Sequence, residues 1–158
     1  SSHPNYMTDE LIKYIGESVK DSKHLKPYLH FALQSGSDKI LKKMNRRHTF
    51  EEFLKRVKKI RREIKNISLS TDVIVGFVDE TEEDFLATIE AEKVCKFDMI
   101  YISEYSARKG TAAAGLKDSV TLEVKTQRKN RLNDVLREVA REYNKQFLSK
   151  ELLVLVVE

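Results

Sequence analysis

Hydrophobic residues along this 158-residue chain recur with two periods that alternate from one segment to the next. Spacings of three and four residues predict helices, and short apolar runs rich in β-branched residues predict strands. The predicted helices cover residues 8–20, 38–44, 49–64, 81 onward and 121–148. The predicted strands cover residues 28–33, 69–77, 97–103 and 152–157. This alternation is typical of βαβ units and a parallel sheet.

Two of the predicted helix starts carry a local signature. Thr49 is followed three residues later by Glu52, which is the spacing of a capping box. Thr81 and Asp84 have the same spacing, with a shorter acid than the capping box prefers. We therefore expect both helices to begin just after a threonine.

The number of strands limits the fold class. Three core strands are few for a closed barrel, which commonly needs about eight. We therefore expect an α/β fold with an open parallel sheet or part of a barrel. A long loop, 105–119, and a long helix follow the third core strand. The last strand, 152–157, has no visible partner and would leave an unpaired edge, so it is interpreted as the first strand of a further domain.

The composition favours a single soluble domain, with 41% hydrophobic and 34% charged residues. No apolar run approaches the roughly 20 residues needed to cross a membrane, so no membrane partner is expected. The only cysteine, Cys95, excludes an internal disulfide and a metal site made only from this chain's cysteines. This cysteine usage fits a reducing compartment, and the expected location is the cytoplasm.

The net charge of +4 conceals a basic block at residues 39–65. The block holds twelve Lys or Arg against three Glu, so it carries +9 and the rest of the chain −5. Such a block can attract nucleic-acid phosphates. The alternative is a solvated helix face, because Lys and Arg are common on exposed helix surfaces.

Small polar residues follow two of the predicted strands, where α/β proteins bind ligands. Gln34 and Gly36 follow the first strand, and Arg46 comes twelve residues after Gln34. Asp72 and Gly76 lie in the second strand. Arginine can clamp a carboxylate, aspartate can accept from ribose hydroxyls, and glycine leaves room for a flat ring. This set suits a nucleoside that carries an amino acid.

Other interpretations of these residues remain open. Gln34 and Ser35 can simply end a strand, and Asp72 can pair with a neighbouring Lys or Arg. Arg108 either closes the same face or is an ordinary loop cation. His30 either contacts a ligand or is a satisfied core histidine. No nucleophile–base constellation supports an unrelated α/β hydrolase.

Three segments, LHFALQSGSDKILKKMNRRHT, STDVIVGFVDETEEDF and YSARKGTAAA, resemble the radical S-adenosylmethionine methylthiotransferases. Members of that family share the patterns HxPLQSGSD…MxR, TDxIxGFPGET and YSxRxGTxA in this order. The resemblance runs from about residue 3 to 148. It implies an incomplete (β/α)₆ barrel that uses S-adenosylmethionine and two 4Fe-4S clusters. The implied reaction inserts a methylthio group into an adenosine of tRNA or an aspartate of a ribosomal protein, and the forms MNRR and YSARKGT favour tRNA.

The resemblance also implies roles for residues and segments. It assigns these residues to S-adenosylmethionine: Gln34, Ser35, Arg46, Asp72, Gly76 (beside the adenine) and Ser106. It gives the basic residues a role in holding tRNA phosphates: Arg47, Lys58, Lys59, Arg61, Arg62 and Arg108. Residues 1–120 are then the C-terminal half of the barrel, 121–149 a linker helix, and 150–158 the start of a TRAM-like RNA-binding domain. A non-catalytic RNA-binding α/β module is the alternative.

The chain departs from the family pattern at several points. Ala32 stands where the family usually has proline, and Val78-Asp79 replaces Pro-Gly in the GFPGET turn. The family's CxxxCxxC loop and N-terminal domain are missing, and the one cysteine of this chain cannot hold either cluster. We therefore expect this chain to be inactive by itself and to expose sheet edges through which it can self-associate.

Overall fold

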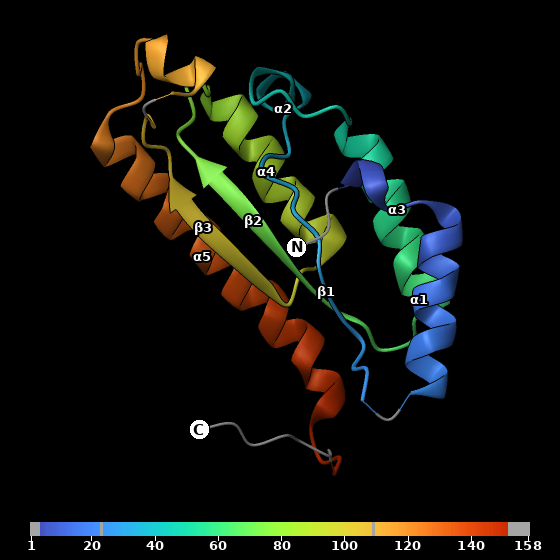
Figure 1. Cartoon of the computed structure of the whole chain (residues 1–158). Coiled ribbons are helices and arrows are strands. Elements are labelled where there is room, and N and C mark those ends of the chain that lie inside the picture. Colours follow the sequence, from blue (N-terminus) through green and yellow to red (C-terminus); the bar gives the residue numbers. More distant parts are fainter. Residues whose placement is uncertain (1–3, 23, 109, 152–158) are drawn as a thin grey trace.

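A three-stranded parallel sheet in the order β1-β2-β3 forms the centre of the molecule (Figure 1). The computed structural model describes residues 4–22, 24–108 and 110–151. The strands are β1 (Tyr28–His30), β2 (Ser68–Val75) and β3 (Met99–Glu104). Tyr28 of β1 pairs with Ser68 of β2, and Ser70 of β2 pairs with Met99 of β3. The predicted α/β fold with a parallel sheet is confirmed.

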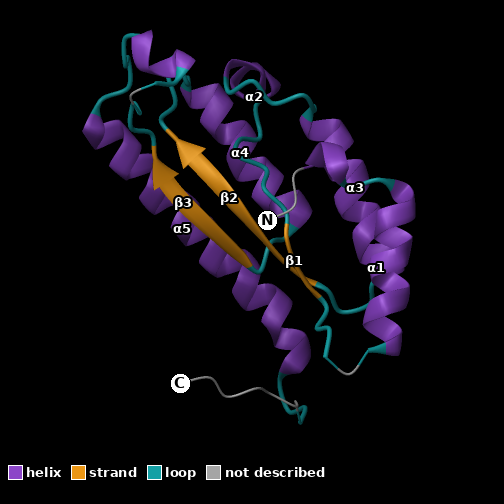
Figure 2. Ribbon diagram, in the orientation of Figure 1, coloured by secondary structure: helices purple, strands orange, loops and turns teal. Residues whose placement is uncertain are grey.

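Helices cover one face of this sheet and leave the opposite face uncovered (Figure 2). The α-helices are α1 (Asp9–Asp21), α2 (Asp38–Lys43), α3 (Phe50–Glu63), α4 (Glu82–Cys95) and α5 (Leu122–Asn144). Short 3-10 helices are η1 (Pro4–Tyr6), η2 (Ala112–Gly115) and η3 (Lys145–Phe147). No helix in the part that the structure describes is long and apolar enough to cross a membrane.

The alternation of side chains along β2 separates the two faces. Leu69, Val73 and Val75 are buried in the hydrophobic core beneath the helices. In that core the rings of Phe31 and Phe53 stack with centroids 4.5 Å apart. Asp72, between these apolar positions, points to the uncovered face because successive strand side chains alternate. On β2 the face toward the helices is therefore mostly apolar, and the open face carries Ser70 and Asp72 beside Ile74.

The first strand is shorter than the predicted 28–33, because regular pairing ends at His30. The Leu33 N–H donates to the Thr71 hydroxyl (2.8 Å) instead of to a strand carbonyl. Gln34 adopts a left-handed backbone (φ 75°) and bridges β2, with its N–H donating to Asp72 O at 2.8 Å. The chain thus stays beside β2 as it turns, which brings Gln34 to the carboxyl edge of the sheet.

Both predicted capping boxes are present. Thr49 caps α3 with Glu52, and Thr81 caps α4 with Asp84 although aspartate is the shorter acid. Burial alone would raise the pKa of Asp84, but hydrogen bonds from Lys39, Thr81 and Ser37 outweigh it and lower that pKa to about 2. The Ser37 hydroxyl donates to Asp84 Oδ1 at 2.7 Å, so one carboxylate joins the start of α2 to the start of α4.

A close backbone approach supports the same junction. A Cβ added to Gly36 would lie 2.3 Å from the carbonyl oxygen of Ala87 in α4. The Gly36 N–H donates to the Thr88 hydroxyl at 2.9 Å. Only glycine permits this distance between the turn and the helix.

The long helix α5 packs on β3 and α4 and is fixed by a buried ion pair. Arg128 Nη1 donates to Glu80 Oε2 (2.8 Å) and to the Glu80 carbonyl (3.0 Å). Burial raises the pKa of Glu80, although the Gly76 N–H and Arg128 favour its charged form. α5 ends at Asn144, followed by η3, so the predicted helix to 148 is slightly too long. The predicted strand 152–157 lies outside the described residues.

Candidate functional site

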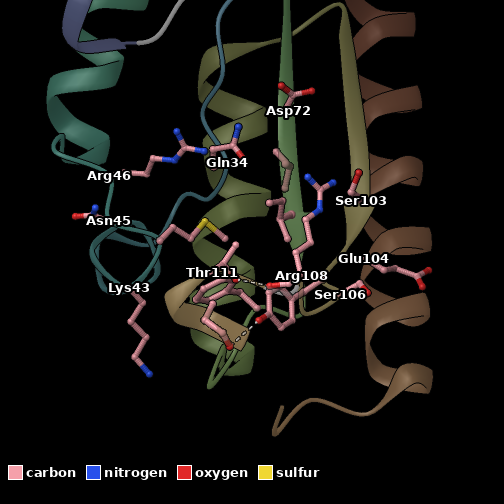
Figure 3. Close-up of a pocket in the computed structure, with 16 residues that line it drawn as sticks. Gln34, Lys43, Asn45, Arg46, Asp72, Ser103, Glu104, Ser106, Arg108 and Thr111 are labelled. Atoms are coloured by element: carbon pink, nitrogen blue, oxygen red, sulfur yellow. Dashed lines mark hydrogen bonds between the residues drawn. The ribbon is translucent and has the colours of Figure 1, made fainter. Parts of the chain in front are cut away.

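A cavity of about 630 Å³ opens at the carboxyl edge of β2 and β3 (Figure 3). Its walls come from the turn after β1, the end of α2, and the segments that follow β2 and β3. Parallel sheets place ligands at this edge. The polar side chains that line it include Gln34, Arg46, Asp72, Ser103, Ser106 and Arg108. The structure therefore brings together residues that the sequence predicts as one site from three separate segments.

Arg46 reaches the cavity through the turn that ends α2. Asn45 has a left-handed backbone (φ 57°), and the Arg46 N–H donates to Leu41 O at 2.9 Å. The Arg46 side chain points toward Gln34 (Figure 3). Its Nε is buried and has no hydrogen-bond partner among the residues that the structure describes. A buried guanidinium N–H without an acceptor is suited to an anionic group of a ligand.

Asp72 of β2 also lines the cavity, and its side chain is 41% exposed. Its Oδ2 lies 2.9 Å from His30 Nε2. The other ring nitrogen, Nδ1, lies 2.9 Å from the Ser70 hydroxyl, which is 2.7 Å from the Tyr28 hydroxyl. His30 is thus on the open face of the sheet beside Asp72, and the side chain that pairs with Asp72 is a histidine and not a Lys or Arg.

Two residues predicted for the site do not line the cavity. Ser35 is fully buried, and its hydroxyl accepts from the Ser37 N–H at 3.2 Å, close to Thr88. Gly76 has φ 70°, but the space beside its Cα is filled by Lys125, whose Cγ would lie 2.3 Å from an added Cβ. The room for a flat ring that the sequence suggests at Gly76 is therefore occupied on that side.

Apolar residues that the sequence analysis did not select line the cavity instead. Ile74 and Phe77 line the cavity, and the Phe77 and Tyr105 rings meet edge to face with their centroids 4.8 Å apart. Ile74 has a sequence signal, because it is two residues from Asp72 and so shares its face. Tyr105 has a sequence signal too, because it directly follows the third predicted strand, beside Ser106, and so could close the same face.

The departure from the family's Pro-Gly turn is accommodated by Asp79. This residue takes the left-handed backbone (φ 58°) that glycine would favour. Its carboxylate accepts from Lys43 Nζ at 2.7 Å and from the Ser119 hydroxyl at 3.0 Å. Hydrogen bonds from Lys43 and Ser119 lower the pKa of Asp79. Asp79 therefore joins α2 to the loop before α5 at the mouth of the site.

The predicted basic set divides into different roles. Arg61 donates to the carbonyls of Cys95 (3.0 Å) and Lys96 (2.7 Å) and so caps the end of α4. Lys59 pairs with Asp9 at 2.6 Å, and Arg62 lies 3.3 Å from Glu63. Lys59 and Arg61 are thus engaged within the protein, whereas the Arg62 side chain remains 71% exposed.

The other members of that set are placed differently. Arg47 and Lys58 are exposed. Arg108 belongs to the cavity at the sheet edge and not to α3. Arg61 differs from these residues because its Nη2 donates to carbonyls at the end of α4.

The described residues do not fit an iron–sulfur cluster. Cys95 is 1% exposed, and burial together with Glu92 raises its thiol pKa to about 12. A buried thiol of this kind is a poor metal ligand. No group of three His, Cys, Asp or Glu within the described ranges could hold a metal ion.

Sequence comparison agrees with the fold. Residues 3–91 match the model of the radical SAM superfamily, and the chain belongs to this family. The chain is 44% identical over 156 residues to a tRNA-2-methylthio-N(6)-dimethylallyladenosine synthase of Clostridium novyi. It is 42% identical to the synthase of that name in Geobacillus kaustophilus and 38% identical to the one in Petrotoga mobilis.

These alignments cover different shares of the two proteins. They include 98–99% of this chain but only 29–35% of the relatives. The chain therefore spans about a third of the length of the curated relatives that it matches.

Proposed function

We propose that this chain is the part of a radical S-adenosylmethionine enzyme that holds the cofactor, and that the enzyme methylthiolates an adenosine in tRNA. The observation that carries the proposal is the convergence of Gln34, Arg46 and Asp72 on one cavity. The names of the relatives favour tRNA over a ribosomal protein as substrate. On this proposal residues 1–120 belong to the barrel and 121–149 link it to an RNA-binding domain.

The chemistry of the cavity matches S-adenosylmethionine. Arg46 would bind the carboxylate of the methionine part, and Asp72 would accept from the ribose hydroxyls. Ile74 and Phe77 offer an apolar surface to the base. A volume of about 630 Å³ lies in the range of small-molecule sites. When bound with a reduced cluster, this cofactor supplies the superfamily's radical chemistry, and the cluster ligands would come from outside the described residues.

Loss of Arg46 or Asp72 is expected to weaken S-adenosylmethionine binding. Arg46→Met or Asp72→Asn should each raise the Kd about tenfold to a hundredfold, because each removes a charge-assisted hydrogen bond. Isothermal titration of the intact protein under non-reducing conditions measures this. Arg47→Met is the matched control, because Arg47 is exposed and does not line the cavity. Unchanged affinity in both variants of a folded protein contradicts the proposed cofactor site.

Binding of tRNA is expected to depend on the exposed side of α3. Lys58→Glu with Arg62→Glu should weaken tRNA binding and reduce the slope of log K against log salt by about 1 to 2, because two phosphate contacts are lost. Filter binding at several salt concentrations measures the slope. Arg137→Glu on the exposed side of α5 is the control. An unchanged slope would show that the basic block is only a solvated face.

A further inference from the structure

We propose that His30 is a positioning residue for Asp72, and that Tyr28 and Ser70 hold its ring in the required orientation. Four side chains from β1 and β2 form this array on the open face of the sheet. Its three contacts measure 2.7 Å (Tyr28 to Ser70), 2.9 Å (Ser70 to His30) and 2.9 Å (His30 to Asp72). The inference rests on the proposed function, in which Asp72 binds the cofactor ribose.

The chemistry of the groups fixes the direction of these hydrogen bonds. An ionised carboxylate only accepts, so the proton of a neutral His30 ring is on Nε2 and is donated to Asp72 Oδ2. The Nδ1 atom is then an acceptor, so the Ser70 hydroxyl donates to it. Because that hydroxyl proton is used, the Tyr28 hydroxyl donates to Ser70 Oγ. The array therefore requires one tautomer of His30.

This arrangement leaves Asp72 ready for a ligand. His30 contacts Oδ2, and no side chain or backbone N–H among the described residues donates to Oδ1. Oδ1 is therefore available to a ribose hydroxyl on the cavity side. The His30 side chain is 17% exposed and does not line the cavity, whereas the Asp72 side chain is 41% exposed and does. Support of this kind fixes the orientation of a binding group before the ligand arrives.

The position of His30 is itself fixed by packing. Its ring lies 5.8 Å from the Tyr101 ring of β3, at a tilt of 52°. Tyr101 is the register partner of Asp72 across the two strands. The ring is thus bounded by Ser70, Asp72 and Tyr101, which leaves the imidazole little freedom to rotate.

The first test is the tautomer. Long-range ¹⁵N–¹H correlation of the intact protein near neutral pH should show the Nε2–H form for His30. Ser70→Ala should convert this signal to a mixture of tautomers, because the donor to Nδ1 is lost. A single Nδ1–H form in the unsubstituted protein overturns the proposal, since that ring could not donate to Asp72.

The second test is the affinity for S-adenosylmethionine under non-reducing conditions. His30→Ala should raise the Kd about tenfold, and His30→Gln should restore most of the affinity because its amide N–H can replace Nε2–H. In an Asp72→Asn background His30→Ala should raise the Kd by less than twofold, because His30 affects binding through Asp72. His24→Ala, an exposed histidine outside the cavity, is the matched control.

The outcomes separate the inference from the function beneath it. If Asp72→Asn weakens binding but His30→Ala does not, the positioning role is wrong and the cofactor site stands. If His30→Ala raises the Kd by the same factor with and without Asp72→Asn, His30 does not act through Asp72 and the positioning role is wrong. If Asp72→Asn has no effect, the proposed cofactor site fails and the inference with it. Should His30→Ala not fold, as judged by circular dichroism, Ser70→Ala and His30→Gln carry the test.

Discussion

Replacing Arg128 by methionine is expected to lower the free energy of unfolding by about 3–5 kcal/mol. The change leaves the Glu80 carboxylate, 1% exposed, without its cationic partner at 2.8 Å. Methionine keeps most of the apolar stem but removes the guanidinium, whose Cζ lies 5.6 Å from the centroid of the Phe85 ring, so the loss reports the charged group. Urea unfolding followed by circular dichroism measures the difference.

A surface pair provides the control for this prediction. Arg137 and Asp134 lie 3.3 Å apart with side chains 80% and 69% exposed, so Arg137→Met should change stability by less than about 0.5 kcal/mol. Adding Glu80→Gln to the Arg128 variant should recover part of the loss, because no buried charge then remains. Equal stability of the Arg128 and Arg137 variants would contradict a structural role for the buried pair.

Replacing Glu92 by glutamine is expected to stabilise the protein by about 3 kcal/mol at pH 7. Glu92 is 1% exposed in α4, and its carboxylate oxygens have no side-chain partner among the described residues. Burial raises its pKa to about 8, and the Phe97 N–H and Arg61 offset only part of that effect. The folded protein must therefore keep this carboxyl protonated at pH 7, which glutamine does not require.

The sign of the pH dependence follows from the raised pKa of Glu92. Between its ordinary value of 4.5 and about 8 the folded state binds the extra proton, so stability falls as pH rises through this window. The glutamine variant should lack this slope and match the unsubstituted protein near pH 4. Glu90→Gln, exposed on the same helix, should leave the slope unchanged. Parallel profiles for the Glu92 variant and the unsubstituted protein would contradict the raised pKa.

Local sequence signals predicted the elements well because their causes are local. Thr49 and Thr81 cap α3 and α4 through contacts only three residues away. The ends of elements were predicted less well where a distant group intervenes. β1 stops early because the Thr71 hydroxyl, 38 residues from Leu33 in the chain, takes the Leu33 N–H.

The candidate site was predicted only in part, because local sequence signals do not show contacts between distant segments. Gln34 and Asp72 meet because parallel strands bring their carboxyl ends to one edge, and Arg46 joins them through the turn that ends α2. The places of Ser35, Gly76 and Arg61 depend on contacts with α4 and α5, which no spacing in their own segments indicates. His30 and Asp72 are 42 residues apart, so their contact requires the register of β1 on β2.

The two anchors of α5 connect distant parts of the molecule. Arg128 holds the turn after β2 through Glu80, and Lys125 Nζ donates to the carbonyl of Tyr105, a residue that lines the cavity. A macromolecule that displaced α5 would therefore disturb both walls of the cavity. By thermodynamic linkage, occupation of the cavity would change the affinity for that macromolecule by the same factor. A macromolecule that displaced α5 and a ligand in the cavity would thus each change the affinity of the other.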